Sequence, residues 1–235
     1  NAYSIMGSTP FVDSLLGIRY ALCEGKQENT RRSLNSFSGE TYLYENPYTL
    51  PVGFMMPDII ADGWHLDLAN PIDVQNEFAS LLGAPDLLVY VPGEESGETF
   101  HFTAAHDGEY YIYIGNRQVR SIRLTIGEKT DTIENVKRGF LIETGWLKAG
   151  ETVRVENKDG PEILDAGAYL FKEDGLAAVY EKLNQNPFVT EEWEDTLLRG
   201  SVDAGQGGVL FFSVPYDAGW EIRVDGEEAP ARKML

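Results

Sequence analysis

With 235 residues, the chain is long enough to bury one large hydrophobic core or two smaller ones. Its 19 basic residues stand against 38 acidic ones, and the formal charge of −19 repels nucleic acid and disfavours docking on anionic lipid through a basic patch. Cys23 is the only cysteine, which excludes an intramolecular disulfide and a cysteine-based zinc site, and no apolar run approaches the ~18 residues that span a bilayer.

The first part of the chain, residues 1–57, is predicted to be an N-terminal segment that packs on β domains. The apolar stretch Leu15–Leu22 fits a buried strand, and the polar stretch Glu24–Glu40 fits a surface loop. Two further strands are predicted at Thr41–Tyr44 and Val52–Met56, because both stretches are apolar and turn-prone prolines lie between them.

A helix is predicted to begin at Asn70-Pro71, with Asn70 as the N-cap and Pro71 at the first helical position. Gly83 is expected to end it. Helical spacing places one apolar stripe on this segment, formed by Val74, Phe78, Leu81 and Leu82.

Between Asp86 and Phe171 the apolar period changes from helical to alternating, which predicts half-buried strands. The Asp107-Gly108 pair predicts a hairpin between the first two of them. Short strands at this spacing favour a β-sandwich or jelly roll, and residues 58–172 are therefore predicted to be a β-sandwich domain. The predicted strands are Phe100–Ala104, Tyr110–Ile114, Ile122–Ile126, Phe140–Trp146 and Thr152–Glu156.

Residues 173–235 are predicted to contain a second short helix, Asp174–Asn184, followed by a second β subdomain. Within it, the stretch Leu210–Gly226 reads as a hairpin in which Val214 faces Trp220. That register buries Trp220 in a core. The fold class expected for the whole chain is mainly β, in sandwich-like or jelly-roll-like layers with two short helices.

The same stretch carries a motif of the form PY-x-x-GW-x-x-x-x-DG, and two shorter matches lie upstream at 15–20 and 44–47. In these residues the chain resembles the C-terminal extracytoplasmic region of the YfhO family of large bacterial membrane proteins. The motif positions, to which the resemblance gives a structural role, are Pro215, Tyr216, Gly219, Trp220, Asp225 and Gly226.

The resemblance implies the soluble, extracytoplasmic domain of a polytopic membrane protein that is similar to GT-C type glycosyltransferases, which decorate lipoteichoic acid or other cell-envelope polymers. It implies acceptor recognition or structural support as the role of this piece, with no catalytic residue in it and a native C-terminal end that extends further. The expected partners are the membrane-embedded remainder of the same polypeptide and an envelope glycopolymer. The alternative is a free-standing carbohydrate-binding or adhesion module without enzymatic activity.

Aromatic side chains are the candidate ligand contacts, because flat rings with a polar edge suit sugar rings. The candidates for ligand binding are Trp64, Tyr111, Tyr113, Trp146 and Tyr216. The competing interpretation is that these rings belong to the core. No cofactor is predicted, although the oxygen-rich loop with Asp58, Asp62 and Asp67 leaves a divalent cation open.

Overall fold

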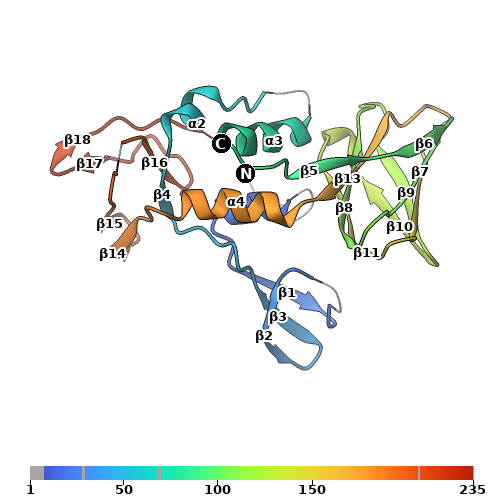
Figure 1. Cartoon of the computed structure of the whole chain (residues 1–235), viewed down its shortest axis with the longest axis horizontal. Coiled ribbons are helices and arrows are strands. Elements are labelled where there is room, and N and C mark those ends of the chain that lie inside the picture. Colours follow the sequence, from blue (N-terminus) through green and yellow to red (C-terminus); the bar gives the residue numbers. More distant parts are fainter. Residues whose placement is uncertain (1–7, 28–29, 68–69, 206, 235) are drawn as a thin grey trace.

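The computed structural model describes residues 8–27, 30–67, 70–205 and 207–234. Across these residues the protein is mainly β, with several antiparallel sheets and short helices, which confirms the predicted fold class. Figure 1 shows three regions: a two-sheet region on the right, a helical middle, and small sheets on the left and below.

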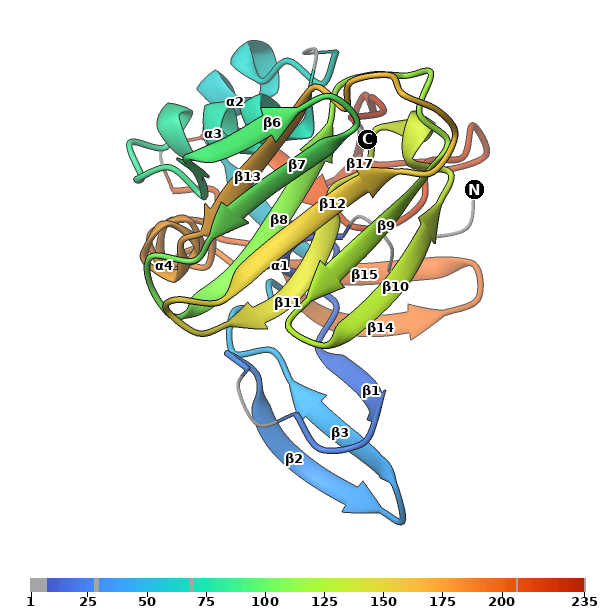
Figure 2. The ribbon, with the colours of Figure 1, turned by 90° about the vertical axis from the view of Figure 1, so that its right-hand side faces the viewer.

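The two-sheet region consists of a five-stranded and a four-stranded antiparallel sheet. The order in the first is β10-β9-β12-β7-β6 and in the second β11-β8-β13-β5 (Figure 2). The inward rings and branched chains of both sheets form one shared core, with Phe102 and Val153 from the first sheet and Tyr110 and Ile112 from the second. The strands are β5 (Leu88–Val91), β6 (Gly93–Ser96), β7 (Thr99–Thr103), β8 (Gly108–Ile114), β9 (Ser121–Ile126), β10 (Lys129–Glu134), β11 (Ile142–Leu147), β12 (Thr152–Asn157) and β13 (Ala166–Phe171).

The predicted strands of this region are present, but the predicted hairpin at Asp107-Gly108 is wrong. Strands β7 and β8 lie in different sheets, so the chain crosses here from one layer to the other. The Tyr110 hydroxyl stabilises the crossing by donating a hydrogen bond to the backbone oxygen of His106 over 2.8 Å. The polar stretch at 128–138 also contains structure, since β10 and a short 3₁₀ helix, η1 (Val136–Arg138), form there.

Four α-helices occur in the described residues: α1 (Pro10–Leu15), α2 (Asp58–Gly63), α3 (Pro71–Leu81) and α4 (Glu173–Leu183). The cap predicted for α3 is confirmed, because the side chain of Asn70 accepts hydrogen bonds from the backbone N–H groups of Ile72 and Asp73. Helix α4 is confirmed as well. The buried strand predicted at 15–22 is wrong, because α1 ends at Leu15, a turn follows, and strand β1 begins only at Tyr20 with exposed and half-buried side chains.

Strand β4 (Gly53–Met56) holds the middle of the molecule together by pairing with β16 (Val209–Phe212), in the register Phe54↔Phe211. The predicted hairpin over 210–226 is therefore wrong. Residues 220–222 form no strand, and β17 (Arg223–Val224) pairs instead with β18 (Glu227–Glu228). As a result Trp220 is 39% exposed and its predicted burial is also wrong.

The helices and the β4–β16 pair share one core, separate from that of the two-sheet region. This core takes residues from all three predicted segments, for example Phe11, Phe78 and Phe211. The division of the chain into segments 1–57, 58–172 and 173–235 stays a prediction. A further hairpin, β14 (Val189–Glu194) with β15 (Leu197–Ser201), agrees with the strands expected after α4.

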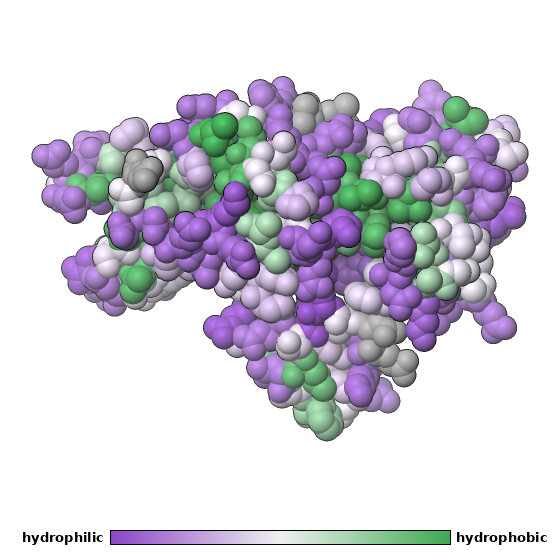
Figure 3. Space-filling model, viewed as in Figure 1, coloured by the Kyte–Doolittle hydropathy of each residue, from purple (hydrophilic) through white to green (hydrophobic). Residues whose placement is uncertain are grey.

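The remaining sheet, in the order β1-β3-β2, projects from the body (Figures 1 and 2). It consists of β1 (Tyr20–Glu24), β2 (Ser33–Ser38) and β3 (Thr41–Glu45). Strand β2 lies where a polar loop is predicted, and its side chains are exposed throughout. Figure 3 shows apolar residues at the tip of this projection, where Leu22 and Phe37 are largely exposed.

Candidate functional site

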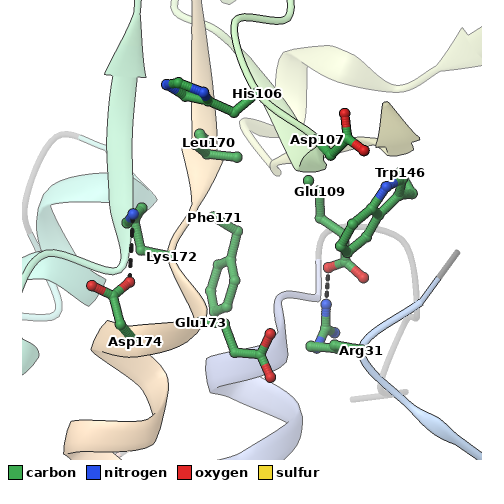
Figure 4. A pocket seen from close by; sticks show the side chains of 11 residues that line it. Arg31, His106, Asp107, Glu109, Trp146, Leu170, Phe171, Lys172, Glu173 and Asp174 are labelled. Carbon is green, nitrogen blue, oxygen red and sulfur yellow. Dashed lines mark ion pairs between the residues drawn. The ribbon is translucent and has the colours of Figure 1, made fainter. Parts of the chain in front are cut away.

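A pocket of about 260 Å³ lies at the end of the four-stranded sheet where β8 begins and β11 and β13 end (Figure 4). The register explains this meeting point, because Gly108 pairs with Leu147 and Tyr110 pairs with Leu170. The start of α4 and the segment before β2 close it. The lining residues are Arg31, His106, Asp107, Gly108, Glu109, Trp146, Leu170, Phe171, Lys172, Glu173 and Asp174.

A buried ion pair between Arg31 and Glu109 forms one wall of the pocket (Figure 4). Only 6% of the Arg31 side chain and 11% of the Glu109 side chain are exposed. Burial lowers the pKa of the Arg31 guanidinium, because desolvation disfavours its charged form. The guanidinium also lies over the ring of Phe171, 5.6 Å from its centroid.

The Nε atom of Arg31 is buried and has no hydrogen-bond partner among the described residues. A buried polar group without a partner is costly, about 1–3 kcal/mol, and such groups in native proteins call for an explanation.

Trp146 gives the pocket an aromatic wall beside this ion pair. It pairs with Glu109 across the β11–β8 ladder, and it follows an irregularity in the register between Glu143 and Gly145. Gly145 has φ +75°, a backbone conformation that side chains resist. The bulge thereby sets the direction of the half-buried indole at the pocket.

Carboxylates from the start of α4 complete the rim. The Tyr48 hydroxyl donates a hydrogen bond to Oε1 of Glu173 over 3.0 Å, which together with burial raises the pKa of Tyr48. Lys172 forms an ion pair with Asp174 at 3.6 Å. The pocket therefore combines an aromatic face, hydrogen-bond acceptors and a buried cationic donor.

The predicted ligand contacts are distributed over the molecule, and only Trp146 lines this pocket. Trp64 packs edge-on against Phe78 and donates from Nε1 to the Val74 carbonyl over 2.7 Å. Tyr111 is 1% exposed, and its ring contacts Phe171 beneath the pocket. Its ring faces are therefore covered by protein.

Tyr113 and Tyr216 lie apart from the pocket. The ring of Tyr113 is buried beneath the guanidinium of Arg117, 5.1 Å from the ring centroid. Tyr216 is exposed in the turn that follows β16, where the Gly219 N–H donates to Oδ1 of Asp217 over 2.7 Å. That hydrogen bond closes the turn at Asp217, and Gly219 adopts no positive φ.

Sequence reasoning missed Arg31 and Glu109. Arg31 falls in a polar stretch that reads as a loop, and Glu109 sits at an alternating strand position where a solvated carboxylate is typical. The one available signal was a carboxylate directly before the predicted apolar strand Tyr110–Ile114, together with a Trp at the end of a later predicted strand, Phe140–Trp146.

In the part of the chain that the structure describes, no group of three or more His, Cys, Asp or Glu side chains is arranged to hold a metal ion, including at Asp58 and Asp62. No helix there is long and apolar enough to cross a membrane.

The fold and the pocket together define a mainly β, layered antiparallel protein with a small pocket lined by polar and aromatic side chains. A family model described as "Bacterial membrane protein YfhO" matches residues 93–235, which is more than half of the chain, and the chain belongs to this family. The matched range includes Trp146 and the motif from Pro215 to Gly226, whereas Arg31 lies before it. Neither the curated proteins nor the solved structures returned a match.

Proposed function

We propose that this chain is the extracytoplasmic part of a membrane-embedded glycosyltransferase, and that it binds the acceptor, lipoteichoic acid or another cell-envelope polymer. The observation that carries the proposal is the pocket in which Trp146 stands beside the buried Arg31–Glu109 pair. Family membership supports the membrane attachment.

The chemistry of the pocket suits a single sugar unit. An indole face packs on the C–H groups of a sugar ring, while carboxylates accept hydrogen bonds from its hydroxyls. The ion pair with Glu109 holds the Arg31 guanidinium in place in the wall of the pocket. The volume of about 260 Å³ is slightly below the about 300–1,000 Å³ of typical sites for drug-sized ligands, so the pocket has room for no more than a small ligand.

Each of the three predicted segments contributes a different part of the proposed binding site. Residues 58–172 supply the layered β domain with most of the pocket, residues 1–57 contribute Arg31, and residues 173–235 contribute the rim from Glu173. The transfer reaction itself belongs to the membrane-embedded remainder of the polypeptide. The isolated chain is therefore expected to transfer no sugar from a polyprenyl-phosphate donor, because such donors lie in the bilayer.

The test is an NMR titration of the chain with lipoteichoic-acid fragments that carry sugar substituents. We expect shifts at the Trp146 indole N–H, loss of binding in Trp146→Ala, and partial recovery in Trp146→Phe, which restores a flat ring. Trp193→Ala is the matched control, because Trp193 is exposed on β14 and does not line the pocket. Titration without any shift at Trp146, or equal losses in both alanine variants, would refute the proposal.

A further inference from the structure

A second, open pocket of about 470 Å³ lies at the opposite end of the four-stranded sheet from the Trp146 pocket. Three segments meet there: the loop after β8, the 3₁₀ helix η1, and the loop between β12 and β13. Strand β8 runs from one pocket to the other, and its seven residues separate them by about 20 Å. The lining residues are Arg117, Gln118, Arg120, Lys137, Asp159 and Glu162.

The cations of this pocket are Arg117, Arg120 and Lys137, and the two arginines differ from most arginines of the chain in having no carboxylate within ion-pair distance among the described residues. Seven other arginines form ion pairs, namely Arg19, Arg31, Arg32, Arg123, Arg154, Arg199 and Arg232. In the described part of the chain, no carboxylate comes within 4.0 Å of the charged groups of Arg117, Arg120 or Lys137. With 38 acidic residues available, this gathering of unpaired cations leaves a site for an anion from outside.

Arg117 is held in place by neutral groups. Its guanidinium donates hydrogen bonds to the Tyr113 hydroxyl and, over 3.3 Å, to the Ile114 carbonyl, and it lies over the Tyr113 ring. Gly139, with φ +74°, makes room for it, because a Cβ there would collide with the guanidinium. The side chain is thus oriented in advance while its positive charge remains uncompensated.

Asp159 lines the pocket, but its carboxylate is bonded to the backbone. Its Oδ2 accepts the N–H groups of Arg120 and Ser121 at 2.6 and 2.8 Å. These bonds keep the pKa of Asp159 below its ordinary value and fix the loop that presents the Arg120 side chain. Glu162 also lines the pocket, so its cations outnumber its carboxylates by three to two.

We propose that this pocket binds a phosphate group, in a site formed by Arg117, Arg120 and Lys137. Arg117 and Arg120 from the loop after β8 and Lys137 from η1 can approach a tetrahedral oxyanion from two sides, and guanidinium forks suit phosphate oxygens. A phosphodiester of a soluble polymer and the headgroup of a phospholipid share this chemistry. The inference goes beyond sugar recognition and holds whether or not the Trp146 pocket binds a sugar.

The test uses glycerophosphoglycerol, a small phosphodiester, in an NMR titration of the chain, alongside flotation with phosphatidylglycerol vesicles and with phosphatidylcholine vesicles. The variant is Arg120→Gln with Lys137→Gln, which leaves the contacts of Arg117 intact. The control is Lys129→Gln with Arg223→Gln, two exposed cations outside the pocket that give the same change in net charge.

We expect the pocket variant to weaken binding of the phosphate ligand by about tenfold or more, since it removes two charge-assisted contacts. The control should change it less than about twofold, and higher salt should weaken binding by the unaltered chain. Binding of the soluble diester points to a polymer as the source, and binding of phosphatidylglycerol vesicles alone points to a lipid headgroup. Binding of neither probe, or equal losses in pocket and control variants, would overturn the proposal.

Discussion

Removing Glu109 should destabilise the protein far more than removing an ordinary surface charge. With only 6% and 11% of the two side chains exposed, Arg31 and Glu109 are both almost fully desolvated. Glu109→Leu therefore leaves an uncompensated buried guanidinium, which costs about 3–5 kcal/mol of unfolding free energy. Arg31→Met combined with Glu109→Leu restores a neutral, apolar wall, and we expect the double variant to recover about 2 kcal/mol or more relative to the sum of the singles.

The measurement is urea unfolding followed by circular dichroism for the unaltered chain and the three variants, with linear extrapolation to water. The exposed pair of Arg154 and Glu156 provides the control, because their side chains are 57% and 27% exposed. The corresponding cycle there should give a coupling of about 1 kcal/mol or less. If Glu109→Leu costs less than about 1.5 kcal/mol, or if both cycles give the same coupling, the buried pair is not energetically distinct and the reasoning fails.

Three further predictions concern other parts of the molecule. The carboxylate of Glu77, 2.9 Å from Nδ1 of His65, raises the pKa of that ring; Glu77→Gln should lower it toward about 6.5 in an NMR titration. Because the pKa is raised in the folded state, this contact stabilises the protein below about pH 6.5, and the contribution is lost as the pH rises through the folded-state pKa. An unchanged His65 pKa in Glu77→Gln would contradict the assignment. The Phe54 side chain is 0% exposed, and Phe54→Ala should lower the unfolding free energy measured in urea by about 3–5 kcal/mol. The Phe37 side chain is 67% exposed, and Phe37→Ala should lower it by less than about 1 kcal/mol. Similar losses in the two variants would refute the assignment of Phe54 to the core. Trp220→Ala should also cost less than about 1.5 kcal/mol, because the ring is 39% exposed and its Nε1 donates only to the Pro215 carbonyl at 3.3 Å.

Local signals in the sequence predicted the elements whose stability is local. The cap at Asn70 and the apolar side of α4 are both found as expected, because helix ends and helix faces depend on residues a few positions apart. The alternation at Tyr110–Ile114 likewise gave the strand. Predictions of which strand pairs with which were wrong where the true partner lies far away in the sequence.

The hairpin predicted at 210–226 shows why. Alternating apolar residues indicate a half-buried strand, but they do not identify its partner, because any apolar strand satisfies the pattern. The partner of Phe211 is Phe54, which lies far upstream in the chain. The same limit applies to Asp107-Gly108, since a turn signal does not distinguish a hairpin from a crossing between layers. Trp146 could be proposed from its type alone, whereas Arg31 became visible only when the fold brought it to Glu109.

The β4–β16 pair has a consequence for how the chain acquires its structure. Strand β4 is made before its partner β16, which follows only after the entire two-sheet region and α4. Closing so long a loop slows formation of the contact, so the central core should consolidate last, after the two-sheet region has formed from nearer neighbours. Until then Phe54 and Met56 lack their strand partner, and this interval is when a growing chain would be most exposed to aggregation and to chaperones.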